Sequence, residues 1–178
     1  MSGVFVTGTD TGVGKTLADC ALVHALASRG VRAGVMKPIA AGGTEDRDAL
    51  MLAAGLGAEW RDTVTPILLR EAIAPHIAAA LERRAITWPP IEGALARLRS
   101  SFGHVVVEGV GGFHVPLGDD WDTEELARRV GQLAAAAKIL QTSPRPALRA
   151  YGAETFGQAL LGAGDRNAAL HQLDQAWD

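Results

Sequence analysis

The sequence has one cysteine, little net charge and no long apolar run, and each shortage excludes a class of protein. Cys20 alone cannot form an internal disulfide, which suits a reducing cytoplasm. A net charge of −3 over 178 residues argues against a general nucleic-acid-binding protein. No apolar run approaches the roughly 18 residues of a membrane helix, and the first motif begins too early for a signal peptide. We therefore expect a cytoplasmic protein with neither a membrane nor a nucleic-acid partner.

Large aromatic side chains are also few, and valine is unevenly distributed. Nine residues are aromatic and 32 are alanine, so the core must be packed largely from small side chains on helices. All 13 valines lie in residues 1–130, whereas residues 131–178 have no valine and 12 alanines. Because β-branched residues fill buried parallel strands, we expect a domain over residues 1–130 and an Ala-rich helical tail over residues 131–178. The tail resembles one tetratricopeptide unit, but a single unit cannot bury its own apolar face, so a generic Ala/Leu helical hairpin is the preferred interpretation.

Strand and helix signals alternate along the first 130 residues. Strands are expected at residues 4–7, 31–36, 65–69 and 104–107. Helices are expected at residues 15–29, 46–55, 75–84, 87–99 and 123–137, and a Gly/Ala loop at 38–45. This order predicts an α/β fold with a parallel sheet, helices on both faces and ligands bound at the carboxyl ends of the strands.

A glycine-rich loop at residues 8–16, Gly-Thr-Asp-Thr-Gly-Val-Gly-Lys-Thr, lies between the first expected strand and helix. In that context it predicts a phosphate loop of a P-loop NTPase, with backbone N–H groups and a helix N-terminus around the phosphates. Lys15 would reach the β- and γ-phosphates and the Thr16 hydroxyl would hold Mg²⁺. The usual pattern has a glycine where this sequence has Thr9. The alternative is a glycine turn that merely joins strand to helix.

Two ionisable residues stand at the ends of other expected strands. Lys37 ends the second strand, and position alone leaves a ligand-binding lysine and a solvated one equally plausible. Glu108 follows a run of three valines and precedes Gly-Val-Gly-Gly. An acid at this position beside a phosphate loop suits a partner of Mg²⁺, and the alternative is a cap for the next turn.

Other polar residues have simpler interpretations. Acids near the start of the helix at 46–55 are favoured by its dipole in any case, so position alone does not choose Asp48 over Asp46 or Glu45. His76 and Cys20 are interpreted as packed side chains. The acidic run at residues 119–122 is interpreted as a solvated turn that caps the next helix.

Taken together, these segments resemble the dethiobiotin synthetase family of P-loop NTPases. The resemblance rests on residues 8–16, on Lys-Pro-Ile-Ala-Ala-Gly at 37–42, on Asp-Ala at 48–49, on Ala-Pro-His at 74–76, on Val-Glu-Gly-Val-Gly-Gly at 107–112 and on Val-Pro-Leu at 115–117. The order and the spacing agree across residues 1–130, and the displaced first glycine is a habit of this family.

The resemblance implies an ATP- and Mg²⁺-dependent ligase of biotin biosynthesis. Such a ligase joins CO₂ to 7,8-diaminononanoate as a carbamate, phosphorylates the carbamate and closes a cyclic urea, and the family is homodimeric. The implied catalytic residues are Lys37, Lys15 and Thr11. The implied nucleotide-binding residues are Gly12, Val13, Gly14, Lys15, Thr16, Leu17, Asp48, Glu108, Gly109, Val110 and Gly111. The implied metal ligands are Thr16, Asp48 and Glu108, and the implied substrate contacts are Lys37 and Ala41.

The sequence departs from the family in two places. Ala41 stands where family members carry a Ser or Thr hydroxyl, a loss of about 1 kcal/mol of hydrogen bonding. The resemblance ends near Val130, whereas family members continue with further strands, including one near the adenine. Two hypotheses follow. One is a dethiobiotin synthetase with an altered C-terminal part. The other is an inactive, truncated or frameshifted nucleotide-binding remnant whose helical tail serves an interaction.

Overall fold

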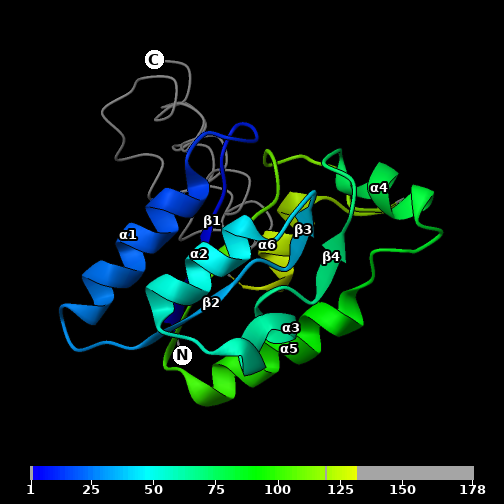
Figure 1. The fold of residues 1–178 in the computed structure, drawn as a ribbon. Coiled ribbons are helices and arrows are strands. Elements are labelled where there is room, and N and C mark those ends of the chain that lie inside the picture. The colour runs from blue at the N-terminus through cyan, green and yellow to red at the C-terminus, as the bar shows by residue number, and fades with distance from the viewer. Residues whose placement is uncertain (1, 119, 132–178) are drawn as a thin grey trace, which may run out of the picture. The chain divides into compact units, whose positions relative to one another are not determined.

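The computed structural model describes residues 2–118 and 120–131, and Figure 1 labels its elements. The chain divides into two compact units, Met1–Ala127 and Arg128–Asp178, and the fold given below is that of the first unit. The predicted helical tail lies outside the described residues, apart from Gly131. None of the described helices combines the length and the hydropathy needed to span a membrane.

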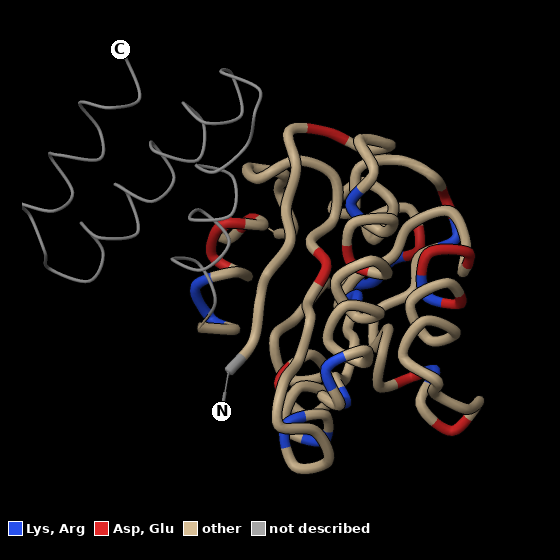
Figure 2. Tube along the Cα trace, turned by 90° about the vertical axis from the view of Figure 1, so that its left-hand side faces the viewer, with Lys and Arg blue, Asp and Glu red and all other residues tan. Residues whose placement is uncertain are grey.

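Strands and helices alternate as the sequence predicts. The strands are β1 (Ser2–Val6), β2 (Ala33–Met36), β3 (Ile39–Ala41), β4 (Ile67–Leu69) and β5 (His104–Glu108). The helices are α1 (Lys15–Ala27), α2 (Glu45–Ala54), the 3₁₀ turn η1 (Ala58–Trp60), α3 (Arg61–Val64), α4 (Pro75–Leu81), α5 (Trp88–Ser101) and α6 (Thr123–Arg129). Acidic and basic residues are interspersed along the described chain (Figure 2). The sequence of α2, for example, places Arg47 between Asp46 and Asp48.

The main sheet has three parallel strands in the order β1-β5-β2. The last strand in the described part of the chain is therefore the central one. Val6 is in register with Glu108, and Met36 with Val107, so all three strands end at one edge of the sheet. The predicted parallel α/β fold is confirmed, and this edge carries the phosphate loop, Lys37 and Glu108.

Helices cover both faces of this sheet, because successive residues of β2 contact different helices. Ala33 and Val35 pack in one buried cluster with side chains of α1 and α2. Gly34 faces the opposite side, where a Cβ atom would lie 2.8 Å from the ring of Phe102 and 3.2 Å from Leu98 at the end of α5. Successive residues of a strand point to opposite faces, so the unit has three layers with the sheet in the middle.

The prediction of a loop over residues 38–45 is wrong at residues 39–41, which form β3. This strand pairs in parallel with β4, which confirms the expected extended segment at 65–69. The N–H of Ile67 donates to the carbonyl of Pro38, and that of Gly42 to the carbonyl of Leu69. A Gly/Ala-rich segment becomes a strand here because a partner 28 residues away supplies these hydrogen bonds, from Ile39 to Ile67.

Several predicted helix ends are shifted by local backbone geometry. Helix α1 ends at Ala27 rather than 29, and α4 ends at Leu81 rather than 84, just before Arg83 takes a φ of 52°. Helix α6 stops at Arg129, short of the expected residue 137, and Gly131 follows with a φ of 70°. Its predicted cap is confirmed, because the N–H of Glu125 donates to Asp122 at 3.0 Å.

Candidate active site

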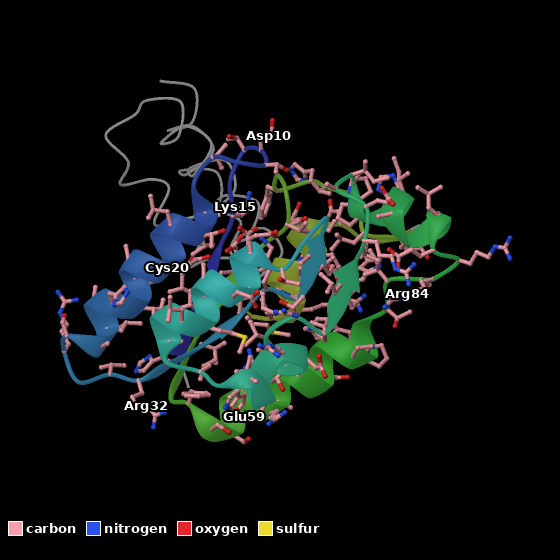
Figure 3. The ribbon with its side chains drawn as sticks, in the orientation of Figure 1. Asp10, Lys15, Cys20, Arg32, Glu59 and Arg84 are labelled. Atoms are coloured by element: carbon pink, nitrogen blue, oxygen red, sulfur yellow. The ribbon has the colours of Figure 1, made fainter. Side chains whose placement is uncertain are left out.

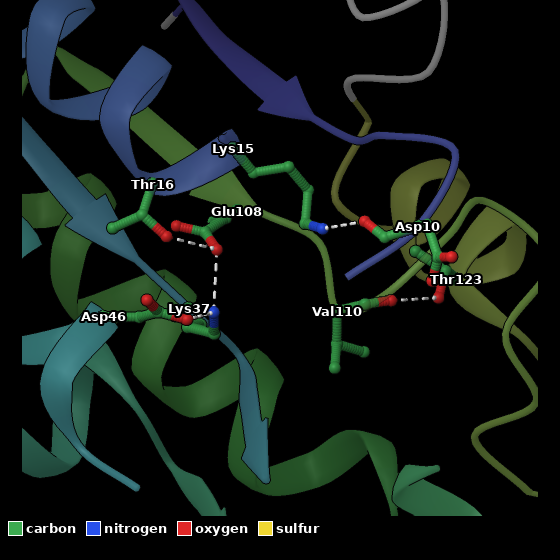
Figure 4. A network of polar contacts seen from close by, with 8 residues as sticks. All are labelled: Asp10, Lys15, Thr16, Lys37, Asp46, Glu108, Val110 and Thr123. Carbon is green, nitrogen blue, oxygen red and sulfur yellow. Dashed lines mark hydrogen bonds and ion pairs between the residues drawn. The ribbon is translucent and has the colours of Figure 1, made fainter. Parts of the chain in front are cut away.

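The predicted phosphate loop connects β1 to α1 and turns back over the start of the helix. Gly12 and Gly14 have φ values of 75° and 94°, a backbone region that glycine adopts without a Cβ penalty. Lys15 opens α1, is 8% exposed, and its Nζ donates to the carbonyl oxygen of Asp10 at 2.8 Å (Figures 3 and 4). Burial lowers the pKa of Lys15, and the charge of Lys37 lowers it further, while Glu108 opposes the shift. The loop therefore holds a buried cation beside its own backbone.

Lys37 follows β2 directly and lies among carboxylates. Its Nζ donates to Glu108 Oε1 at 2.7 Å and also pairs with Asp46 (Figure 4). The residue is 6% exposed, and its backbone N–H donates to Val64 of α3, which fixes the main chain at the strand end. Burial alone would lower the pKa of Lys37, but the charge of Glu108 and the hydrogen bonds to Asp46 and Glu108 outweigh burial and raise it. Lys37 is thus held as an ammonium ion.

Glu108 ends the central strand and joins the two lysine regions. Its Oε1 accepts hydrogen bonds from the Thr16 hydroxyl at 3.1 Å and from Lys37 (Figure 4). The residue is 1% exposed, and its Oε2 has no hydrogen-bond partner among the described residues. A buried carboxylate with one engaged and one orphaned oxygen is suited to bind a further cation or donor.

A cavity of about 770 Å³ opens over this edge of the sheet. Ten of the sequence-predicted site residues line it: Thr11, Gly12, Gly14, Lys15, Thr16, Lys37, Ala41, Glu108, Val110 and Gly111. Opposite the phosphate loop, the wall is formed by residues 72–75, before and at the start of α4. The phosphate loop, the Lys37 region and the Glu108 region, far apart in sequence, therefore face one space.

Four sequence-predicted site residues lie outside the lining of this cavity. Val13 and Leu17 are 52% and 77% exposed, and a Cβ atom at Gly109 would lie 3.0 Å from the ring of Phe5. Asp48 is exposed, and its carboxylate accepts hydrogen bonds from Thr44 and Arg47 on its own segment. The two hydrogen bonds hold the pKa of Asp48 below its usual value.

Two further acids lie at the site, and the sequence reasoning did not select either. Asp46 lines the cavity and binds Lys37, and although partial burial opposes it, this hydrogen bond lowers the pKa of Asp46. Asp46 was one of three acids near the start of α2, with Glu45 and Asp48, between which sequence position alone did not choose. Asp19 is fully buried on α1, one helical turn after Lys15. The spacing of four residues from Lys15 was the available signal for Asp19.

The donor set fits a hard divalent cation. Mg²⁺ prefers oxygen ligands and is bound in proteins by one or two carboxylates, hydroxyl groups and phosphates. The Thr16 hydroxyl and Glu108 Oε1 already lie 3.1 Å apart, and Asp46, which lines the same cavity, pairs with Lys37. The orphaned Oε2 of Glu108 is a second observation that the carboxylate has unused capacity. These residues match the chemistry of a magnesium–phosphate site.

Comparison with known proteins adds a family and several relatives. The model of a family described as "AAA domain" matches residues 2–131. The "ATP-dependent dethiobiotin synthetase BioD" of Janthinobacterium sp. (strain Marseille) is 46% identical over 138 residues, covering 71% of this chain and 58% of that protein. The protein of the same name from Ralstonia nicotianae is 48% identical over 135 residues, with the same coverage. A third, from Aromatoleum aromaticum, is 45% identical over 134 residues and is covered to 60%. The chain thus spans about three fifths of the length of these curated relatives.

Proposed function

This chain belongs to the AAA domain family, and we propose that it is an ATP- and Mg²⁺-dependent ligase that makes dethiobiotin. Its substrates would be 7,8-diaminononanoate, CO₂ and ATP. The observation that carries the proposal is that Lys15, Lys37, Thr16 and Glu108 line one cavity beside the phosphate loop. The names of the relatives, which match over 71% of this chain, support the choice of reaction.

The proposed reaction has three steps. An unprotonated amine of the diamine attacks the carbon of CO₂ and loses a proton, which gives a carbamate. A carbamate oxygen then takes the γ-phosphoryl group of ATP, and ADP leaves. Finally the second amine attacks the carbonyl carbon and loses a proton, the C–O bond to phosphate breaks, inorganic phosphate leaves and the cyclic urea closes. Each step needs an anion held close to positive charge, because carbamate, phosphoryl group and leaving phosphate are all negative.

The two buried lysines would supply that charge. The ammonium groups of Lys15 and Lys37 would lower the pKa of a nearby substrate amine, since two cations disfavour a third. They would also stabilise the carbamate and the transferring phosphoryl group. The raised pKa of Lys37 supports this role, because the side chain stays charged when a neutral amine is required beside it.

The phosphate loop would hold the nucleotide through its backbone. We propose that the N–H groups from Gly12 to Leu17 surround the phosphates and that the segment from Glu108 to Gly111 lies along the nucleotide. Thr16, Glu108 and an acid from the first turn of α2 would hold Mg²⁺, which would supply charge neutralisation at the β- and γ-phosphates. The location of Asp46 in the cavity lining, paired with Lys37, favours Asp46 as that acid, whereas the family resemblance favours Asp48.

Two residues on the cavity wall would face the diamine or the transferred group. Thr11, within the phosphate loop, lines the cavity and carries a hydroxyl, and Ala41 lines it with a methyl group. The resemblance also makes a homodimer and a cytoplasmic location part of the proposal.

The experiment supplies the 178-residue chain with ATP, MgCl₂, bicarbonate and 7,8-diaminononanoate, and measures dethiobiotin by mass spectrometry. We expect one ADP for each dethiobiotin, and no product when either ATP or the diamine is left out. The Lys15→Ala variant serves as the matched control for the phosphate loop. Folded protein that gives no product refutes the ligase. If that protein still binds ATP, the alternative of a nucleotide-binding remnant, inactive as a ligase, replaces it.

A further inference from the structure

The loop that follows β5 is fastened to the start of α6 by hydrogen bonds. The N–H of Thr123 donates to the carbonyl of Val115 at 3.1 Å, and Pro116 forms an isolated antiparallel bridge with Asp122. The Thr123 hydroxyl donates to the carbonyl of Val110 at 3.3 Å (Figure 4). The same loop lines the cavity at Val110 and Val115. Side chains on these two segments are therefore held at a defined distance from each other.

Three side chains of these segments, each with an atom that can bind a metal ion, converge on one point. His114 comes from the loop, and Asp122 and Glu124 come from the start of α6. The His114 Nδ1 and one carboxylate oxygen of each acid all lie within 4.8 Å of one another. Asp122 uses its two oxygens differently, because Oδ1 accepts from the N–H of Glu125 and caps the helix, whereas Oδ2 faces His114. The cap predicted from the sequence thus occupies only one oxygen of this carboxylate.

The distances within this group fit a shared cation better than hydrogen bonds. His114 Nδ1 lies 3.5 Å from Asp122 Oδ2 and 3.6 Å from Glu124 Oε2. Hydrogen bonds from N–H to oxygen are usually about 2.7–3.2 Å long, and one ring nitrogen carries at most one proton for two acceptors. Nitrogen and oxygen ligands lie about 2.0–2.2 Å from Zn²⁺, so two ligands of one tetrahedral ion are about 3.3–3.5 Å apart. The separations from Nδ1 are therefore close to those that a single tetrahedral ion requires.

The chemistry of the three donors selects the class of metal ion. Imidazole nitrogen suits Zn²⁺, Ni²⁺ and Cu²⁺, whereas Mg²⁺ prefers oxygen ligands and retains several waters. Two carboxylates balance the charge of a divalent ion, and three protein ligands leave one tetrahedral position for water. The His114 side chain is 58% exposed, and those of Asp122 and Glu124 are 34% and 17% exposed, so an ion can reach the group from solvent.

We propose that His114, Asp122 and Glu124 form a second metal site, which binds Zn²⁺ or a related transition-metal ion and links the loop after β5 to α6. None of the three residues lines the cavity, so the bound ion would be structural and would not touch the nucleotide. Its effect would be to hold the part of the loop that does line the cavity. The site differs in chemistry from the magnesium site proposed at Glu108, whose donors are all oxygen atoms.

The test measures zinc binding to the untagged 178-residue chain after EDTA treatment and dialysis. Calorimetry with ZnCl₂ is carried out in excess MgCl₂, which occupies sites built from oxygen ligands alone. We expect the affinity for zinc to fall at least about 10-fold in both His114→Gln and Glu124→Gln, because loss of a residue one step behind a metal ligand already costs about 10- to 100-fold. Zinc should raise the melting temperature of the parent chain more than that of either variant. Co²⁺ in place of zinc should give the visible absorption of a tetrahedral ion, and His114→Gln should abolish it.

A matched control separates this site from adventitious binding to surface histidines. His24→Gln removes an exposed histidine from the last turn of α1, outside the group, and should bind zinc as the parent does. If His114→Gln does not fold, His114→Ala takes its place. A parent chain that binds no zinc in MgCl₂ overturns the inference, as does a loss of less than 10-fold in either ligand variant or an equal loss in His24→Gln. These outcomes do not depend on dethiobiotin formation, so failure of the ligase would leave them unchanged.

Discussion

Replacing Lys37 by alanine tests the centre of the site, because this residue holds two carboxylates together. Its Nζ lies 2.7 Å from Glu108 Oε1 and also pairs with Asp46 (Figure 4). The Lys37→Ala variant loses the cation and leaves Glu108, 1% exposed, without its main counter-charge. We expect ATP to bind still, because the phosphate loop is untouched, and dethiobiotin formation to fall at least about 100-fold, in line with the loss of a preorganised charge.

The same substitution has a cost in stability that can be estimated. At an effective dielectric constant of about 20, two unit charges 2.7 Å apart attract by about 332/(20 × 2.7), or about 6 kcal/mol. Desolvation of both groups offsets part of this, and removal of one partner of a buried pair typically costs about 3–5 kcal/mol. This is a large fraction of the roughly 5–15 kcal/mol that stabilises a domain. Magnesium should therefore raise the melting temperature of Lys37→Ala more than that of the parent chain, since it restores positive charge beside Glu108.

Urea denaturation measures the loss of stability, thermal denaturation with and without MgCl₂ measures the effect of magnesium, and the dethiobiotin assay measures the loss of activity. Arg47→Ala is the control, because it removes a similarly buried cation, 12% exposed, that pairs with the exposed Asp48 outside the cavity. Unchanged dethiobiotin formation by Lys37→Ala would remove this residue from the mechanism. A loss of stability no larger than that of Arg47→Ala would refute the reasoning about the buried pair.

Three further predictions address the neighbouring acids and the sheet. Asp46→Asn should weaken magnesium-dependent ATP binding by about tenfold and Asp48→Asn by less than twofold, measured by calorimetry, and the reverse order would restore Asp48 as the metal ligand. Gly34→Ala should lower the free energy of unfolding by about 1–3 kcal/mol in urea, because the new Cβ would lie 2.8 Å from the ring of Phe102, and an unchanged midpoint would contradict this packing. Burial and the nearby Glu108 raise the pKa of Asp19 to about 8. Without magnesium, the folded chain therefore keeps a proton on Asp19 that the unfolded chain loses above about pH 4, so the free energy of unfolding falls as the pH rises. Asp19→Asn has no acid to titrate at this position, so its free energy of unfolding in urea, relative to that of the parent, should be higher at pH 8 than at pH 5. The same difference between the two proteins at both pH values would refute the prediction.

The sequence predicted the parts of the site that depend on local pattern. Residues 8–16 combine glycines, a lysine and a threonine between a strand and a helix, and each of these signals lies within nine residues. Lys37 and Glu108 were found because both stand at strand ends, and parallel strands bring their carboxyl ends to one edge. Local sequence and one rule of topology were enough for these residues.

Other features depend on contacts that local pattern does not contain. The strand at residues 39–41 exists because residues 67–69 pair with it, and nothing in its own Ile-Ala-Ala sequence marks that partner. Asp19 is buried because its helix face meets Glu108, 89 residues later in the chain. The choice between Asp46 and Asp48 depends on the rotation of α2 about its axis, which the amphipathic pattern of a short, Ala-rich helix does not fix.

The position of β5 between β1 and β2 has a consequence for folding during synthesis on the ribosome. Ser2 pairs with His104, so β1, once synthesised, must wait for a partner about 100 residues behind it. At a synthesis rate of about 5–20 residues per second, this delay is roughly 5–20 s. During that time β1 and β2 are synthesised without their central neighbour, and their apolar segments have no sheet to join. Nascent chains of this protein therefore pass through a long period in which a chaperone could bind Val4, Phe5 and Val35.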